Sequence, residues 1–190
     1  MSTLVIYAHP NPKSFNHAIK LEVEAALKKQ GKEFMTRDLY ELNFQPVLQG
    51  SDFAAFSAKK PTADIAREQE FIRNADTLVF IHPVWWFGMP AILKGYIDRV
   101  FSAGFAYSYT SKGPEGLLKG KRVIIINTTG GDEKTYNEGG FKEALKKTHE
   151  LGIHNFCGLT VAEHKYFHAV PMSKPETRAK MLEEVKQMMF

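Results

Sequence analysis

Short, mostly apolar runs alternate with amphipathic stretches along this chain. Residues Leu4–Tyr7, Thr77–Ile81 and Val123–Ile126 are predominantly apolar, which is typical of parallel strands that are buried on both faces. Phe34–Thr36 is a weaker match to a strand, and Phe156–Val161 is a fifth candidate. The pattern therefore predicts five strands separated by helical segments.

The segments between these strands have the spacing of helices. Residues 14–30 place Ile19, Val23 and Ala26 on one helical face, and Gly31 ends the pattern. The remaining helices are expected from about residue 62 to 74, from Pro90 to about Phe101, from a Gly-rich turn to about Leu151, and from Ser173 onward.

Two local signals complete this prediction. Ser173 and Glu176 have the spacing of a capping box at the start of the last helix. Proline and glycine within residues 43–61 predict a loop there. Alternating strands and helices with right-handed crossovers imply one open, doubly wound α/β domain over residues 1–190, with a parallel sheet covered on both faces.

Two common nucleotide-binding motifs are missing from the sequence. The first strand is not followed by G-x-G-x-x-G, which disfavours a classical dinucleotide-binding Rossmann domain. The chain also has no G-x-x-x-x-G-K-[ST], which excludes an ordinary P-loop NTPase.

Composition narrows the function classes only slightly. The net charge of +4 is spread over the 190 residues, so it suits an anionic cofactor without indicating nucleic-acid binding. The single cysteine, Cys157, excludes an intrachain disulfide and a cysteine metal cluster, and its apolar neighbours predict a buried, inert thiol. With no targeting segment and no apolar stretch near 18 residues, we expect a cytoplasmic protein without membrane insertion.

Ligands of open α/β sheets bind beyond the carboxyl ends of the strands. The loop after the first strand leads into a helix N-terminus, where free N–H groups attract phosphate. Ser14 is the candidate N-cap, and His9 and Asn16 can donate hydrogen bonds to phosphate oxygens. The alternative is a capped turn with Phe15 in the core.

The loop after the third strand is unusually aromatic. Between Pro83 and Pro90 it carries Val84, Trp85, Trp86 and Phe87 in succession. Aromatic side chains at a strand end can stack against a flat ring. The alternative is a hydrophobic loop that fills the core or an interface.

The loop after the fourth strand reads Thr128, Thr129, Gly130, Gly131, and Tyr136 follows. Two glycines let a ligand approach the backbone and orient N–H groups toward an anionic oxygen. The alternatives are a plain turn and a partly buried surface tyrosine. Together, the three loops suit a flavin, although another planar phosphorylated ligand would also fit.

Four segments carry a resemblance to a known family. They are His9-x-x-x-x-Ser14-Phe15-Asn16, the run from Trp86 to Gly95, the run from Phe105 to Tyr109, and Thr128 to Gly131. Over nearly its whole length, the chain resembles the NAD(P)H:quinone oxidoreductases typified by DT-diaphorase. The resemblance implies a flavodoxin-like fold with strand order 2-1-3-4-5, a homodimer, and FAD, with FMN as the alternative cofactor.

The same resemblance implies roles for residues. The phosphate and ribityl chain would be held by His9, Ser14, Phe15 and Asn16, and the isoalloxazine would be lined by Pro83, Val84, Trp85, Trp86 and Phe87. The pyrimidine edge would be faced by Thr128, Thr129, Gly130, Gly131 and Tyr136. Tyr107 and Tyr109 would reach the partner's substrate pocket.

Arg178 matches a family position near the adenosine half of FAD; an ordinary exposed helix arginine is the alternative. Two departures from the family pattern matter. Lys142 stands where well-known members have a histidine six residues after the tyrosine, and the loop between Asn43 and Thr62 is shorter than in those members.

The expected reaction is hydride transfer from NAD(P)H to flavin N5 and then to a quinone, by a ping-pong mechanism in one shared site. Trp86 and Phe87 would hold the nicotinamide, while Gly130, Gly131 and Tyr136 would stabilise charge at N1–O2. The alternatives are a flavin reductase or azoreductase, and a regulatory flavoprotein subunit of a potassium-efflux system.

Overall fold

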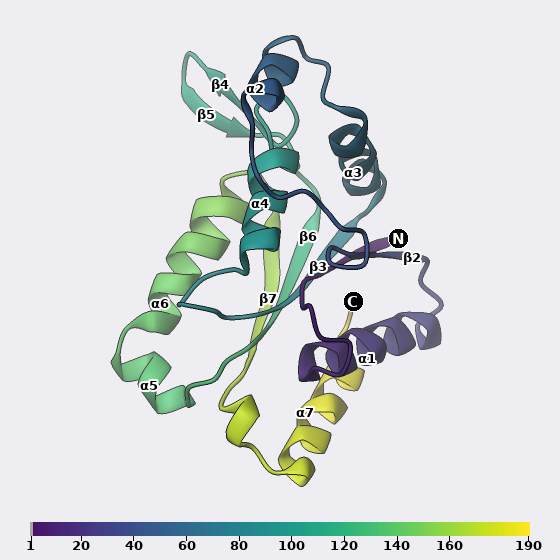
Figure 1. The fold of residues 1–190 in the computed structure, drawn as a ribbon, viewed down its shortest axis with the longest axis vertical. Helices are drawn as coiled ribbons and strands as arrows, with labels where there is room; N and C mark the ends of the chain where they lie inside the picture. The colour runs from purple at the N-terminus through teal and green to yellow at the C-terminus, as the bar shows by residue number, and fades with distance from the viewer. Residues whose placement is uncertain (1) are drawn as a thin grey trace.

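The computed structural model describes residues 2–190 and has a parallel sheet at its centre (Figure 1). The strand order β2-β1-β3-β6-β7 confirms the predicted order 2-1-3-4-5 of a doubly wound, flavodoxin-like sheet. The strands are β1 (Thr3–Tyr7), β2 (Phe34–Asp38), β3 (Thr77–Pro83), β6 (Arg122–Thr128) and β7 (Thr160–Phe167).

Helices cover both faces of this sheet, because successive strand side chains point to opposite sides. Leu4 and Ile6 of β1 belong to the core on one face, whereas Val5 and Tyr7 belong to the core on the other. The first core is covered by α3 (Ala63–Asn74), α4 (Ala91–Val100) and η1 (Lys146–Asn155), and the second by α1 (Phe15–Lys29) and α7 (Pro175–Gln187).

The predicted capping box at the last helix is wrong. Helix α7 begins at Pro175, whose fixed φ suits the first helical position, and its N-cap is Lys174. Ser173 lies before the helix, at the end of the short 3₁₀ turn η2 (Val170–Met172), and donates its hydroxyl to the Val170 carbonyl at 2.7 Å.

The predicted fifth strand is also misplaced, since β7 starts four residues later, at Thr160. Residues 156–159 form the turn before it, where Gly158 adopts a φ of 86° and packs against the Gly116 backbone. The apolar character of this run reflects burial in that turn rather than a strand. Cys157 is buried there as expected, and burial raises the pKa of its thiol to about 11.

Several elements were not predicted. Residues 43–61 contain the helix α2 (Gly50–Ser57), and the segment after α4 forms a hairpin of β4 (Tyr107–Thr110) and β5 (Gly113–Gly116). The single helix expected after the Gly-rich turn is divided into α5 (Glu133–Glu138), α6 (Phe141–Leu145) and the π-helix η1. Within residues 2–190, no helix combines the length and apolarity needed to span a bilayer.

Candidate active site

The three loops singled out above meet at the carboxyl ends of the central strands. The Val84 N–H donates to the Thr128 carbonyl at 2.8 Å, and the Ala8 N–H donates to the Ile81 carbonyl at 3.0 Å. Between them lies a cavity of about 330 Å³. Its lining comprises His9, Ser14, Phe15, Asn16, Pro83, Val84, Trp85, Thr128, Thr129, Gly130, Val170 and Pro171.

One end of the cavity is the N-terminus of α1. The Ser14 side chain caps the helix by accepting the His17 N–H at 3.1 Å. The first turn contains no acidic residue, and within residues 2–190 the N–H groups of Phe15 and Asn16 have no acceptor. Free donors at the positive end of a helix dipole form a site for an anion such as a phosphate group.

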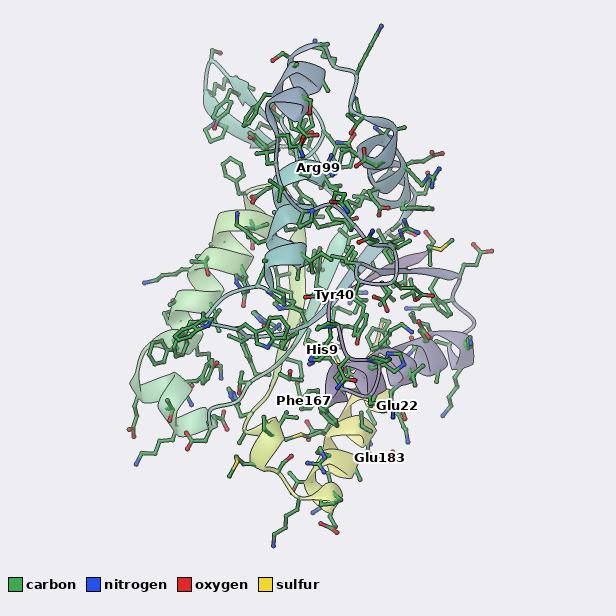
Figure 2. All side chains as sticks on the ribbon, viewed as in Figure 1. His9, Glu22, Tyr40, Arg99, Phe167 and Glu183 are labelled. Atoms are coloured by element: carbon green, nitrogen blue, oxygen red, sulfur yellow. The ribbon has the colours of Figure 1, made fainter. Side chains whose placement is uncertain are left out.

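His9 adds a donor to this end of the site (Figure 2). The Asn11 N–H donates to His9 Nδ1 at 3.0 Å, so the proton of the neutral ring sits on Nε2. Burial lowers the pKa of His9, which favours this neutral form. The ring also meets the Trp85 ring edge-on, at 5.7 Å between centroids, which links the phosphate end to the aromatic loop.

Asn16 carries an unsatisfied acceptor. Its Nδ2 donates to Thr128 Oγ1 at 2.7 Å, which fixes the amide across two loops. Its Oδ1 is buried and has no hydrogen-bond partner in the part of the chain that the structure describes. Since an orphaned buried acceptor is costly, this atom calls for a donor from a ligand, such as a hydroxyl.

The aromatic loop is a tight, strained turn. Trp85 and Gly88 exchange two backbone hydrogen bonds of 3.0 and 3.1 Å, while Trp86 and Phe87 between them adopt left-handed φ values of 48° and 54°. Such conformations cost roughly 1–3 kcal/mol each and gather at functional sites. The turn leaves the N–H groups of Trp86 and Phe87 without an acceptor among residues 2–190, and the Trp86 side chain is 98% exposed.

The Gly-rich loop presents a second pair of free donors. The Thr129 hydroxyl donates to the Gly131 carbonyl at 2.7 Å, whereas neither the Gly130 nor the Gly131 N–H has an acceptor in the described chain. Tyr136 packs over Gly131 and is 5% exposed. Burial raises the pKa of the Tyr136 hydroxyl, so the group remains a neutral donor.

Comparison with known proteins gives the family of this chain. Residues 1–189 match the family model described as flavodoxin-like fold. The chain is 37% identical to an uncharacterized NAD(P)H oxidoreductase of Haemophilus influenzae, over 98% of this chain and 93% of that protein. It is 33% identical to the rat NAD(P)H dehydrogenase [quinone] 1, over 97% and 74% of the two chains. The chain belongs to the flavodoxin-like NAD(P)H:quinone oxidoreductase family.

Solved structures agree with this family assignment. The NAD(P)H:quinone oxidoreductase from Methanothermobacter marburgensis superposes with a TM-score of 0.89 at 26% identity, covering 98% of this chain and 96% of that one. The relatives thus share the whole described fold, and the family's enzymes are named for NAD(P)H and quinone.

Sequence reasoning missed a fourth segment that contributes to the cavity, the one after β7. Val170 and Pro171 line the cavity, and His168 lies beside Tyr136 with 5.2 Å between ring centroids. The rule that ligands bind beyond strand ends would have found this segment. Because the fifth strand was placed too early, residues 168–171 were not recognised as a strand-end loop.

Some predicted site residues lie away from the cavity. Tyr107 and Tyr109 are on the hairpin, beyond the carboxyl end of α4 and therefore at the opposite end of the sheet (Figure 1). Arg178 donates to the Ser173 carbonyl at 2.6 Å and does not line the cavity. Lys142 lies on α6 with its Nζ 4.0 Å from a Glu133 carboxylate oxygen.

Proposed function

We propose that this chain is a flavin-dependent NAD(P)H:quinone oxidoreductase. The observation that carries the proposal is the unpaired polar set of the cavity. It combines free amides at a helix N-terminus and an orphaned Asn16 Oδ1. Two further pairs of free amides follow lining residues of the cavity: those of Trp86 and Phe87 after Trp85, and those of Gly130 and Gly131 after Thr129. A phosphate, a polyhydroxyl chain and a flat heterocycle would satisfy these groups in that order.

The residues fit a flavin as follows. The Phe15 and Asn16 amides, with His9 Nε2–H, hold the phosphate, and Asn16 Oδ1 accepts from a ribityl hydroxyl. The amides of Trp86 and Phe87 lie toward one edge of the ring system. When bound, a flavin supplies the acceptor for a hydride and passes two electrons on to a quinone.

The Gly130 and Gly131 amides and the Tyr136 hydroxyl would stabilise negative charge on the ring. Fixed donors in a partly buried site act without reorganisation, and they gain strength as charge develops. The donors that would stabilise the charge therefore come from the loop after β6 and from Tyr136, which packs against that loop.

Trp86 and Phe87 would form the wall against which NAD(P)H and then a quinone stack. Trp86 and Phe87 are 98% and 48% exposed, so a planar substrate could cover the Trp86 ring and the part of Phe87 that its stacking on Phe141 leaves open. Because one exposed face would serve both substrates, the first product leaves before the quinone binds, and ping-pong kinetics follow.

We also propose a homodimer in which Tyr107 and Tyr109 complete the partner's pocket. Tyr109 is 75% exposed and lies on the hairpin, at the opposite end of the sheet from the cavity of its own chain. Replacing either tyrosine with alanine should raise KM for the quinone and leave flavin content stoichiometric. Sedimentation of a fully active monomer at micromolar concentration would contradict the shared site.

The deciding experiment is to purify the protein, release its chromophore and identify it by mass, which also distinguishes FAD from FMN. Stopped-flow mixing with NADH and NADPH, followed by a panel of quinones, azo dyes and free flavins, then tests the acceptor class. A colourless protein that neither FAD nor FMN reconstitutes would overturn the proposal. A flavin-loaded protein without turnover would favour a regulatory role.

A further inference from the structure

The end of β7 and the segment after it are joined to the Gly-rich loop by three backbone hydrogen bonds. The Thr129 N–H donates to the Phe167 carbonyl at 2.9 Å, the Val170 N–H to the Thr129 carbonyl at 3.1 Å, and the Ala169 N–H to the Gly131 carbonyl at 2.9 Å. Ala169 has a left-handed φ of 51°, a strained conformation for a residue with a Cβ. The hydrogen bonds at Phe167, before His168, and at Ala169 and Val170, after it, hold the backbone in this conformation.

The hydrogen bonds of Thr129 fix the tautomer of His168. The Thr129 hydroxyl gives its only proton to the Gly131 carbonyl, at 2.7 Å. His168 Nδ1 lies 3.0 Å from the same oxygen, which has only lone pairs left to offer. Nδ1 therefore carries a proton, and in the neutral ring Nε2 holds the free lone pair.

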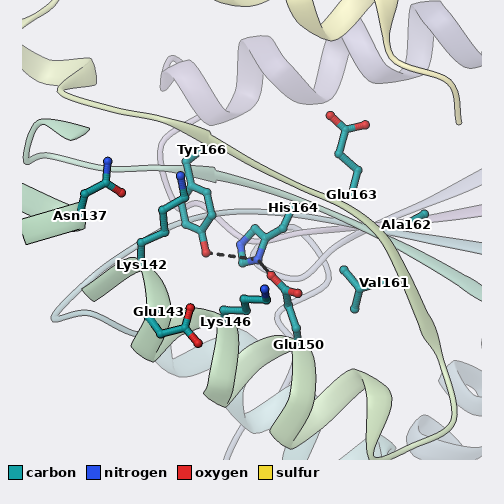
Figure 3. Close-up of a pocket in the computed structure, with 10 residues that line it drawn as sticks. All are labelled: Asn137, Lys142, Glu143, Lys146, Glu150, Val161, Ala162, Glu163, His164 and Tyr166. Atoms are coloured by element: carbon teal, nitrogen blue, oxygen red, sulfur yellow. Dashed lines mark hydrogen bonds and ion pairs between the residues drawn. The ribbon is translucent and has the colours of Figure 1, made fainter. Parts of the chain in front are cut away.

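His168 ends a row of rings on one side of β7. The Tyr166 ring lies between those of His164 and His168, at centroid distances of 4.2 and 5.8 Å, and is nearly parallel to His168 at 7°. Figure 3 shows a pocket beside β7 whose lining includes His164, Tyr166 and Lys142. His168 lines a second open cavity, of about 430 Å³, through which it can exchange protons with solvent.

The charged and titratable groups around His168 come from four elements. Burial is the main influence and lowers the pKa of His168, so the ring rests neutral; Glu133 and Asp132 act in the opposite sense, and Lys142 adds to the lowering. The facing groups are Asp132, Glu133 and Tyr136 at α5, Lys142 on α6, His164, Lys165 and Tyr166 on β7, and Glu184 on α7.

We propose that His168 is a positioning residue that takes up a proton on Nε2 when negative charge appears at the Gly130–Gly131 amides. The inference rests on the proposed flavin function. Solvent supplies the proton, neutral imidazole becomes imidazolium, and the Nδ1–H bond to Thr129 is kept throughout. The positive charge on His168 then balances one negative charge on the reduced ring. Hydrogen bonds through Thr129 hold the imidazolium beside the Gly131 loop, so His168 acts without contacting the cofactor.

The proposal predicts a proton linked to reduction. Between the pKa values of His168 in the oxidised and reduced proteins, the flavin midpoint potential should fall with pH by one extra proton per two electrons. Since each pH unit is a tenfold change in proton activity, the extra slope is about 30 mV per unit for a two-electron couple. His168→Gln should lose this slope, whereas Tyr166→Phe, which keeps the stacked ring, should retain it.

Nitrogen NMR of the wild-type protein provides a measurement that needs no variant. The flavin-free protein should show the Nδ1–H tautomer of His168, and reduction of the loaded protein should raise its pKa by at least one unit. An unchanged pKa, or an unchanged potential slope in flavin-loaded His168→Gln, would overturn the inference and leave the proposed function intact. Failure of the wild-type chain to bind FAD or FMN would overturn both.

Discussion

Two regions of the molecule differ in whether their polar groups are paired. One is the cavity at the carboxyl ends of the strands, and the other is the cluster around Arg99 at the carboxyl end of α4. Arg99 Nε and Nη2 bind both Asp52 carboxylate oxygens at 3.0 Å, and Nη1 binds Asp64 Oδ2 and the Gln45 carbonyl. Asp52 and Arg99 are 2% and 7% exposed. Figure 2 labels Arg99 and His9, which lie in different parts of the molecule. In the cavity, by contrast, Asn16 Oδ1 and several backbone donors lack partners.

The difference separates stability from binding. A buried polar group whose partners come from the protein holds elements together, here residues 45–64 against α4. A buried polar group without a partner costs free energy until a ligand supplies one. Isolated unpaired atoms also occur elsewhere, as at His154. The candidate site is therefore marked by several unpaired backbone donors and the Asn16 acceptor gathered around one cavity.

The largest effect is expected from breaking the paired region. Arg99→Met would leave the buried Asp52 carboxylate without its partner, and such a loss costs about 3–5 kcal/mol. Urea denaturation measures it. The matched control is Lys94→Met on the same helix, which breaks an exposed pair with Asp98 and should cost less than about 1 kcal/mol. Equal costs for the two variants would refute the comparison.

A second prediction concerns the histidines buried beside the sheet. Burial lowers the pKa of His82 and His154 to about 3 and that of His149 to about 4. The unfolded chain titrates near pH 6.5, so it binds protons that the folded protein refuses as pH falls from about 6.5 to 4. At pH 5 each such histidine should lower the free energy of unfolding by about 2 kcal/mol.

His154→Leu tests this pH dependence. Both ring nitrogens of His154 lack partners among the described residues, so the variant should lose less stability than wild type between pH 8 and pH 5. The Arg99 region acts in a different window: the Arg99 hydrogen bonds lower the pKa of Asp52, and that stabilisation is lost only as pH falls below about 4. Parallel pH profiles for variant and wild type would contradict the assignment.

The sequence predicted the central strands and the three loops because their signals are local. Apolar runs such as Val123–Ile126 mark strands buried on both faces, and strand ends mark the site. Strand β7 is at the sheet edge and mixes Glu163, His164 and Lys165 with apolar residues, so it gave no continuous run. The misplacement hid His168.

The Arg99 cluster could not be predicted either. Its partners lie 35 and 47 residues away in the chain, and no local pattern pairs Arg99 with Asp64 or Asp52. The amides of Trp86 and Phe87 are free because both residues adopt left-handed φ values in a tight turn. Composition does not reveal such a conformation at two large residues.

A smaller effect is expected from removing an unpaired group. Asn16→Ala should weaken flavin binding about tenfold or more, since a buried hydrogen bond to a ligand hydroxyl and the link to Thr128 are both lost. Calorimetric titration of the flavin-free protein measures this. Asn137→Ala, at an exposed asparagine, is the matched control and should bind normally. Identical affinities would remove Asn16 from the site.

The smallest expected effect belongs to Tyr136, a group that should act on the rate rather than on binding. Tyr136→Phe keeps the ring that packs on Gly131 and beside His168, so flavin affinity should stay close to that of wild type. The hydroxyl contributes only about 0.5–1.5 kcal/mol as a neutral hydrogen bond, but its contribution grows as charge develops on the flavin. We expect flavin reduction by NAD(P)H to slow about tenfold, which corresponds to roughly 1.4 kcal/mol. Lys142→Ala should have less effect, because the Lys142 side chain is half exposed and 4.0 Å from Glu133. Stopped-flow measurement of the reductive half-reaction tests both variants, and an unchanged rate in Tyr136→Phe would leave the Gly130 and Gly131 amides as the stabilising donors of this loop.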